Sequence, residues 1–242
     1  MGDVTTRVGI EETAYEMLKT SNQLFGMIRA MEDPADRYDH AQHKSQYDKI
    51  AKFVIEYVQK QMVEKYYLKE VWMPENEHVE ERFHNMPKCN IFMSPEFRRP
   101  NVEENKQRKR ACVLIQGTGA VRAGIWARSV CINENLELGS MLPFVDRCYE
   151  LGIPVLVMNP NFGSDPETGV GIPHSRSMAE HAAFVWDKYV LNSGFDEICV
   201  VAHSAGGGCV SQIQKQFEDT FYSQVSKIAY TDSWVISKSD LD

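Results

Sequence analysis

Six short apolar runs, which alternate with helical segments in the second half, constrain this 242-residue chain more than any other feature. From Ala111 onward each run is followed by a stretch that favours a helix, an alternation typical of a parallel sheet with helices on both faces. The runs are "EVWM" at 70–73, "CNIFM" at 89–93, "ACVLIQ" at 111–116, "IPVLVMN" at 153–159, "EICVVAH" at 197–203 and "KIAYTD" at 227–232. The predicted helical segments are 120–130 with 139–151, then 175–193, then 205–218.

The first part of the chain has a different pattern. Residues 11–31 and 43–67 are predicted helices, and in the second helix apolar residues recur at three- and four-residue spacing along one face. No helical segment separates the first two apolar runs, so they are expected to form an antiparallel edge of the sheet. We therefore expect an N-terminal helical extension at 1–45 and one α/β domain at 46–242.

Composition narrows the classes of function. Hydrophobic residues make up 43% and charged residues 25%, and no apolar run approaches the roughly 18 residues of a membrane span. The net charge of -8 argues against direct binding of nucleic acid, because attraction to phosphate is mainly electrostatic. The six cysteines contain no C-x-x-C pair, so neither a disulfide framework nor a metal site is expected.

One hydroxyl stands where the fifth run meets a glycine-rich segment, "AHSAGGG" at 202–208. A nucleophile elbow needs a strand that stops abruptly, a serine in a strained turn, and small residues two before and two after it. Ala202, Ser204 and Gly206 meet these demands, although glycine is usual in the first place. Ser204 is therefore a candidate nucleophile, and the alternative is a tight turn in which its hydroxyl only caps the next helix.

An acyl-transfer enzyme also needs an oxyanion hole, made partly by the amide after the nucleophile and partly by the loop after the third strand. Ala205 and the glycines of "QGTGAVRAG", Gly117 and Gly119, are the candidates. The competing interpretation is a dinucleotide-binding fingerprint, but Arg122 occupies its last glycine position and the next strand ends in an amide rather than an acid. No cofactor is expected.

The general base is the missing part of this predicted site. Asp232, at the end of the last apolar run, is the candidate acid, but no histidine follows Ser204 in the chain. His203 should point to the opposite face of its strand, which leaves His174, in the Gly/Pro-rich loop 160–174, as the candidate base. Either the catalytic histidine belongs to a missing C-terminal segment, or the site does not hydrolyse by this route.

Several segments together resemble the domain named after argonaute-binding protein two. They are "QGTGAVRAGIWARSVCINENLELGSMLPFVDRC", "VLVMNPN", "AEHAAFVWDKYV", "VVAHSAGGG" and "AYTDS". The resemblance implies an α/β-hydrolase-like fold, with Ser204 as a candidate nucleophile. It also implies work in small-RNA silencing, heterochromatin and splicing through argonaute or chromatin-associated proteins. Two departures are Val235, where family members often have histidine, and the end at Asp242, which omits the last strands of a full hydrolase fold.

Two functions follow from these observations. One is an adaptor in a nuclear silencing or RNA-processing complex, also present in the cytoplasm, for which the basic segment 98–110 could serve as a nuclear localisation signal or be a solvated loop. The other is a serine hydrolase that acts on a small acyl-type ligand through Ser204. Arg122 and Arg128 could bind an anionic group near the cleft or pair with carboxylates of the protein.

Overall fold

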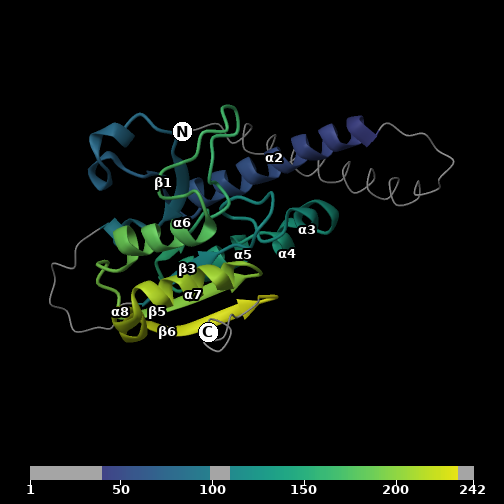
Figure 1. Cartoon of the computed structure of the whole chain (residues 1–242). Helices are drawn as coiled ribbons and strands as arrows, with labels where there is room; N and C mark the ends of the chain where they lie inside the picture. The colour runs from purple at the N-terminus through teal and green to yellow at the C-terminus, as the bar shows by residue number, and fades with distance from the viewer. Residues whose placement is uncertain (1–39, 99–109, 234–242) are drawn as a thin grey trace, which may run out of the picture.

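A six-stranded mixed sheet with helices on both faces forms the body of the molecule in the computed structural model, which describes residues 40–98 and 110–233 (Figure 1). The strand order is β1-β2-β4-β3-β5-β6. The strands are β1 (Lys69–Met73), β2 (Cys89–Met93), β3 (Arg110–Ile115), β4 (Val155–Val157), β5 (Glu197–His203) and β6 (Val225–Thr231). The α/β fold predicted from the alternation is thus confirmed.

Strand direction sets where a site can form. β2 is antiparallel to both β1 and β4, which confirms the predicted antiparallel edge, whereas β4, β3, β5 and β6 are parallel neighbours. β1 therefore runs in the same direction as β4, and every strand except β2 ends at the same edge of the sheet. In open α/β sheets ligands bind outside this carboxyl edge.

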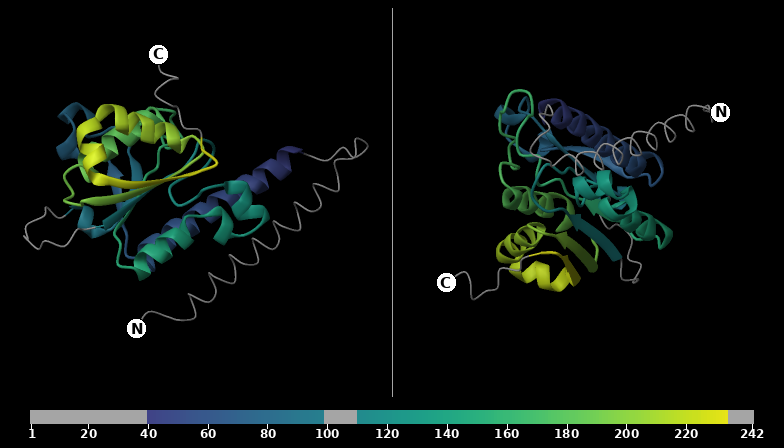
Figure 2. Two further views of the ribbon diagram at one scale, coloured as in Figure 1. Left: turned by 90° about the horizontal axis from the view of Figure 1, so that it is seen from below. Right: turned by 90° about the vertical axis from the view of Figure 1, so that its right-hand side faces the viewer.

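The central strands β2, β3, β4 and β5 are covered on both faces because they are apolar at almost every position, whereas the edge strands β1 and β6 have exposed positions. Ala111, Val113 and Ile115 of β3 belong to the core on one face, and Cys112 and Leu114 to the core on the other. The first face is covered by α6 (Met178–Val185), the π-helical turn η4 (Trp186–Val190), α7 (Gly206–Gln216) and α8 (Glu218–Gln224). The second is covered by α2 (His40–Glu64) and α5 (Leu142–Glu150), and α3 (Arg128–Asn133) and α4 (Leu136–Gly139) pack against α2 on the same side of the molecule (Figure 2).

The predicted helix 43–67 is α2, whereas the predicted helix 11–31 lies outside the described residues. α2 is amphipathic: Met62 packs against the sheet, Val54 and Val58 pack against α3 and the loop 121–125, and Lys49, Lys52 and Lys60 are exposed. It runs across the expected boundary between residues 45 and 46, so one continuous helix joins the two expected segments.

One predicted helix is wrong in its first half. The segment 120–127 is a loop, and α3 begins only at Arg128. Val121, Ala123 and Ile125 are buried in this loop, and the carbonyl of Gly124 (φ 95°) accepts a hydrogen bond of 2.7 Å from the Met141 amide. Tertiary contacts therefore hold an extended, glycine-dependent path that local periodicity did not indicate.

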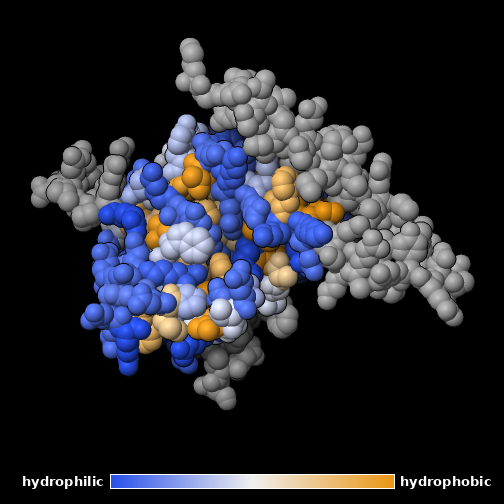
Figure 3. All heavy atoms as spheres, turned by 90° about the horizontal axis from the view of Figure 1, so that it is seen from above, coloured by the Kyte–Doolittle hydropathy of each residue, from blue (hydrophilic) through white to orange (hydrophobic). Residues whose placement is uncertain are grey.

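The connections include three short 3-10 turns, η1 (Asn76–His78), η2 (Glu81–Phe83) and η3 (Pro95–Arg98). Hydrophobic side chains on the face shown in Figure 3 lie in small separate groups among hydrophilic ones. Within the described ranges, no helix has the length and apolar character needed to cross a bilayer.

Candidate functional site at the carboxyl edge

Ser204 occupies a strained turn between β5 and α7. Its φ of 51° lies in the left-handed region, which costs a residue with a β-carbon about 1–2 kcal/mol. Main-chain hydrogen bonds hold it there: its amide donates to the Thr231 carbonyl at 3.0 Å, and its carbonyl accepts from the Gly207 amide at 3.2 Å and the Ser233 hydroxyl at 2.6 Å. The backbone has the strand–elbow–helix geometry that exposes a nucleophile in α/β-hydrolases.

Two glycines allow neighbouring backbones to approach this elbow. A β-carbon on Gly117 would lie 2.6 Å from the β-carbon of Ser204, and one on Gly206 would lie 2.7 Å from the Ile115 carbonyl oxygen. Gly206 thus lets the start of α7 pack on the end of β3. Gly117 places the loop after β3 directly against the candidate nucleophile.

The candidate oxyanion donors separate into two groups. The structure brings Gly117 and Ala205 to Ser204, and neither main-chain N–H donates to an acceptor among the described residues. Gly119 is exposed, and a β-carbon built on it would contact nothing within 4 Å. The geometry therefore favours Gly117 and Ala205 over Gly119 as the pair of donors beside the serine.

The structure does not join the candidate acid and base to Ser204. Asp232 (φ 48°) lies at the same edge, just beyond β6, where it is exposed. His174 stacks on Phe184 of α6, with ring centroids 4.5 Å apart, and in the described chain no hydrogen bond links it to Ser204. His203 bonds the Thr231 hydroxyl at 3.1 Å instead. The roles assigned to Asp232 and His174 stay predictions.

Arg122 and Arg128 have different surroundings. Arg128 forms an ion pair with Asp48 of α2 at 3.3 Å and lies over the Tyr47 ring, so it belongs to the helix interface. Arg122 lies over the ring of Phe162, 4.9 Å from its centroid, and donates to the carbonyls of Val121 and Asn161 at 3.1 and 3.4 Å. Burial lowers its pKa.

A buried hydrogen-bond network underlies the loop that carries Gly117. The Asn159 side chain accepts from Gln116 Nε2 at 3.2 Å and from the Ala123 amide at 3.0 Å, and donates to Asn90 Oδ1 at 2.8 Å. Asn161 donates from its side chain to the carbonyl of Gly117. These amides fix the loop relative to β2 and β4, so the position of Gly117 beside the elbow depends on them.

His181 of α6 completes this network with a defined tautomer. It is fully buried, which lowers its pKa to about 3 and keeps the imidazole neutral at pH 7. Its Nε2 accepts from the Asn159 amide at 3.0 Å, so the ring proton is on Nδ1 and is donated to the Ser175 hydroxyl, 2.9 Å away. Ser175 in turn donates to the Phe162 carbonyl at 3.0 Å. His181 is therefore a structural acceptor rather than a base for Ser204.

Sequence reasoning did not assign site roles to Gln116, Asn159, Asn161 or His181. The signal was present, because amide residues follow buried strands at the carboxyl edge, where a buried polar side chain needs partners. Their partners come from β2 and α6, distant in sequence, and could not be read from spacing.

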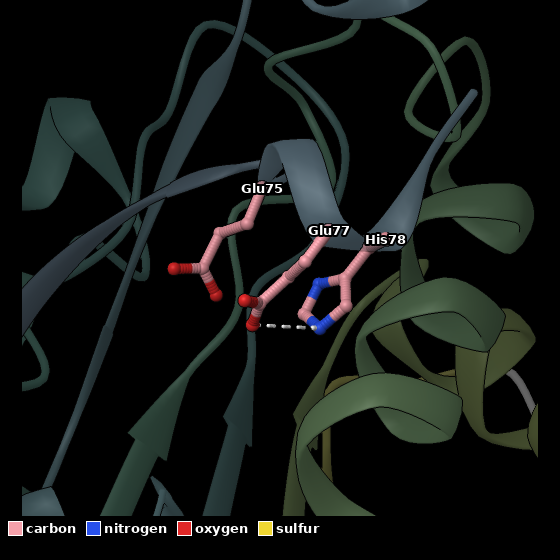
Figure 4. Close-up of side chains that lie close together, drawn as sticks. All are labelled: Glu75, Glu77 and His78. Atoms are coloured by element: carbon pink, nitrogen blue, oxygen red, sulfur yellow. Dashed lines mark ion pairs between the residues drawn. The ribbon is translucent and has the colours of Figure 1, made fainter. Parts of the chain in front are cut away.

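A second group of polar side chains lies beyond β1. Glu75, Glu77 and His78 have ligand atoms within 4.8 Å of one another (Figure 4). Glu75 already accepts from the Tyr189 hydroxyl at 2.9 Å and pairs with Arg98. Its carboxylate is thus used in joining η1 to η3 and η4, and we assign it to packing of the sheet edge rather than to a metal.

The sequence profile of the Arb2 domain matches residues 25–163, more than half of the chain. The chain belongs to the Arb2 domain family. The matched segment contains the loop 116–124 and both amides of "NPN", and it ends before Ser204. The Arb2 match therefore includes Asn90, Gln116, Ala123, Asn159 and Asn161 of the network, whereas Ser175, His181 and the elbow lie beyond it.

Named relatives agree with the Arb2 assignment. The chain is 39% identical over 143 residues to the FAM172 family protein homolog of Caenorhabditis elegans, which covers 59% of this chain and 42% of that protein. It is 27% identical over 245 residues to the cotranscriptional regulator ARB2A of Mus musculus, covering 80% and 56%. A bacterial heroin esterase matches with a TM-score of 0.36 and 14% identity, over 78% of this chain and 53% of the esterase. The chain spans about half the length of the curated relatives it matches.

Proposed function

We propose that this chain is an adaptor module in nuclear cotranscriptional regulation, which binds other proteins through an α/β-hydrolase-like body. The observation that carries the proposal is that the serine at the carboxyl edge of the sheet has no base beside it among the described residues. Ser204 is held in an elbow, yet no histidine of the described residues hydrogen-bonds to it, and His181 is bonded in the network. A serine hydroxyl without a general base is a poor nucleophile at neutral pH.

The family supports the cellular setting of this proposal. Relatives in mouse, human and Dictyostelium discoideum carry the name cotranscriptional regulator ARB2A or homolog of it. The resemblance to argonaute-binding protein two extends the proposal to argonaute or chromatin-associated partners and to small-RNA silencing or heterochromatin. The net charge of -8 supports contact with nucleic acid through those partners rather than directly.

Proximity labelling in cells tests the partner. The tagged 242-residue chain should label argonaute or chromatin-associated proteins above a tag-only control, and Ser204→Ala should label the same set, because binding does not need the hydroxyl. Exclusion of the tagged chain from the nucleus, with neither class of protein labelled, would overturn the adaptor proposal.

The basic segment 98–110 is the proposed nuclear localisation signal. Its end residues are engaged in the fold: Arg98 pairs with Glu75, and Arg110 pairs with Glu197 at 3.0 Å. The four other basic residues, Arg99, Lys106, Arg108 and Lys109, lie outside the described residues.

Changing Lys106, Arg108 and Lys109 together to Gln tests the signal without touching these ion pairs. We expect loss of nuclear accumulation of a fluorescent fusion. The control is Lys49→Gln with Lys52→Gln on the exposed face of α2, which should leave it unchanged. Equal nuclear fractions for both variants would assign the segment to a solvated loop.

The strained elbow favours one second candidate function, acyl transfer. The Gly117 and Ala205 amides lie beside Ser204 without a protein acceptor in the described chain, as an oxyanion hole requires. Steady-state hydrolysis of p-nitrophenyl esters of two to eight carbons tests it. A rate for wild type that exceeds the Ser204→Ala rate would support the hydrolase, and equal rates would exclude it for these esters.

A further inference from the structure

Arg122 carries a positive charge into a partly buried position that no carboxylate of the described residues neutralises. Arg122 takes part in none of the lysine and arginine ion pairs formed between described residues. Arg128, six residues further on, has Asp48 as its partner. Buried charges in proteins are paired or bind a ligand, since an uncompensated charge out of water is costly.

The contacts of the Arg122 guanidinium leave most of its donors unused. Nη1 donates to two carbonyls, Val121 O and Asn161 O, and the ring of Phe162 covers one face of the plane. Nε and Nη2 donate to no group in the described ranges. A guanidinium presents its N–H groups in a fork that matches carboxylate and phosphate oxygens, so the open edge has the geometry for an oxyanion.

The position of this guanidinium relates it to the elbow. Arg122 bonds the main chain of Asn161, the side chain of Asn161 bonds the carbonyl of Gly117, and Gly117 lies against Ser204. Two residues therefore separate the cationic group from the elbow.

Gln116, which begins the same loop, is completely buried, and no described residue donates a hydrogen bond to its Oε1. This oxygen needs a donor, so it does not by itself select an oxyanion. Turning the amide would not help, because the Ala123 amide fixes Asn159 Oδ1 as an acceptor, and Gln116 Oε1 would then face another acceptor oxygen. An unpaired buried acceptor costs about 1–3 kcal/mol unless a water or a ligand donor satisfies it.

We propose that Arg122 binds the oxyanion group, a carboxylate or a phosphate, of a small molecule whose remaining atoms extend toward Ser204 along the carboxyl edge. This inference goes beyond the adaptor function and needs no reactivity of Ser204. An adaptor with such a site would be a ligand-responsive one, in which the bound oxyanion neutralises Arg122.

Titration of the full 242-residue chain with simple oxyanions tests the site. Acetate, succinate and inorganic phosphate are the probes, chloride at equal ionic strength is the reference, and binding is followed by thermal shift and calorimetry. We expect saturable stabilisation of wild type by at least one oxyanion and not by chloride. Stabilisation by the carboxylates identifies a carboxylate ligand, and stabilisation by phosphate alone identifies a phosphorylated one.

Two arginine variants locate the binding. Arg122→Gln should weaken oxyanion binding at least tenfold, the loss expected for charge-assisted hydrogen bonds. Arg128→Gln, which removes a guanidinium paired with Asp48, should stay within twofold of wild type. Arg122→Lys keeps the positive charge but loses the forked N–H donors of the guanidinium, so it should bind the oxyanion at least threefold more weakly than wild type. This variant tests the site even if Arg122→Gln does not fold.

Several outcomes would overturn the proposal. Among them are no saturable effect of any oxyanion on wild type, an equal effect of chloride, and unchanged affinity in both Arg122 variants. A lower melting temperature of Arg122→Gln by the same amount in every buffer, without any anion dependence, would assign Arg122 to packing of the loop against Phe162. None of these results bears on the partners found by proximity labelling, so the two proposals fail separately.

Discussion

Replacing Ser204 by glycine should stabilise the protein relative to replacing it by alanine. At φ 51° a β-carbon costs about 1–2 kcal/mol, and alanine retains this cost whereas glycine removes it. Glycine also makes the unfolded chain more flexible, which returns about 0.4–1 kcal/mol to the unfolded state. The net expectation is that Ser204→Gly has a free energy of unfolding about 0.5–1 kcal/mol higher than that of Ser204→Ala.

Urea denaturation followed by circular dichroism measures this difference, with equal m-values required for the comparison. Ser211, inside α7, supplies the matched control, because its hydroxyl donates to the Gly207 carbonyl and both substitutions remove that bond equally. There the order should be reversed, with Ser211→Gly about 0.5–1 kcal/mol less stable than Ser211→Ala. The same order at both serines would refute the strained elbow.

Three further predictions concern the surroundings of the elbow. Gly117→Ala should lower the free energy of unfolding by about 1–3 kcal/mol in the same urea assay, because its β-carbon would lie 2.6 Å from that of Ser204. Gly208→Ala is the control: this glycine has open space around it in α7, so the substitution should raise the free energy of unfolding by about 0.5–1 kcal/mol. Asn159→Ala should lower the free energy of unfolding by about 3–5 kcal/mol in the same urea assay, since it leaves two buried donors, Gln116 Nε2 and the Ala123 amide, and the acceptor Asn90 Oδ1 unpaired. Burial lowers the pKa of His181 to about 3 in the folded protein, whereas the unfolded chain has an ordinary value of about 6.5. Between these two pH values only the unfolded chain binds a proton at His181, so the free energy of unfolding falls with pH by up to about 1.4 kcal/mol per pH unit. His181→Gln, compared with wild type between pH 7 and 5, should flatten that slope, and an unchanged slope would contradict the buried neutral imidazole.

The central strands could be predicted from the sequence because they are apolar on both faces and bounded by turn-forming residues. β2 and β5 have the bounds that their apolar runs indicate, and the antiparallel edge followed from the missing helix between the first two runs. The loop 120–127 could not be predicted, since burial of Val121 and Ile125 against α2 and α3, rather than local propensity, fixes its path. α8 was not predicted either, because Phe221, its buried residue, packs against Trp186 of η4, which is distant in sequence.

In the candidate site, too, local features could be predicted and long-range contacts could not. The strand–serine–glycine order indicated the elbow, because small residues and a strained turn are local features, and the structure places Gly117 and Ala205 beside Ser204. Pairing of Arg128 was not predictable, since Asp48 lies 80 residues away on α2. Nor was the Asn159 network, whose partners come from three other elements.

Labelling of Ser204 by a fluorophosphonate probe tests the central claim, that the elbow is built but not activated by a base, most directly. The 242-residue chain at pH 7.5 would be compared with Ser204→Ala by gel fluorescence and by mass spectrometry of the labelled peptide. The account predicts labelling of wild type equal to that of Ser204→Ala. Labelling of wild type at Ser204, abolished by the substitution, would contradict it and establish the chain as a serine hydrolase.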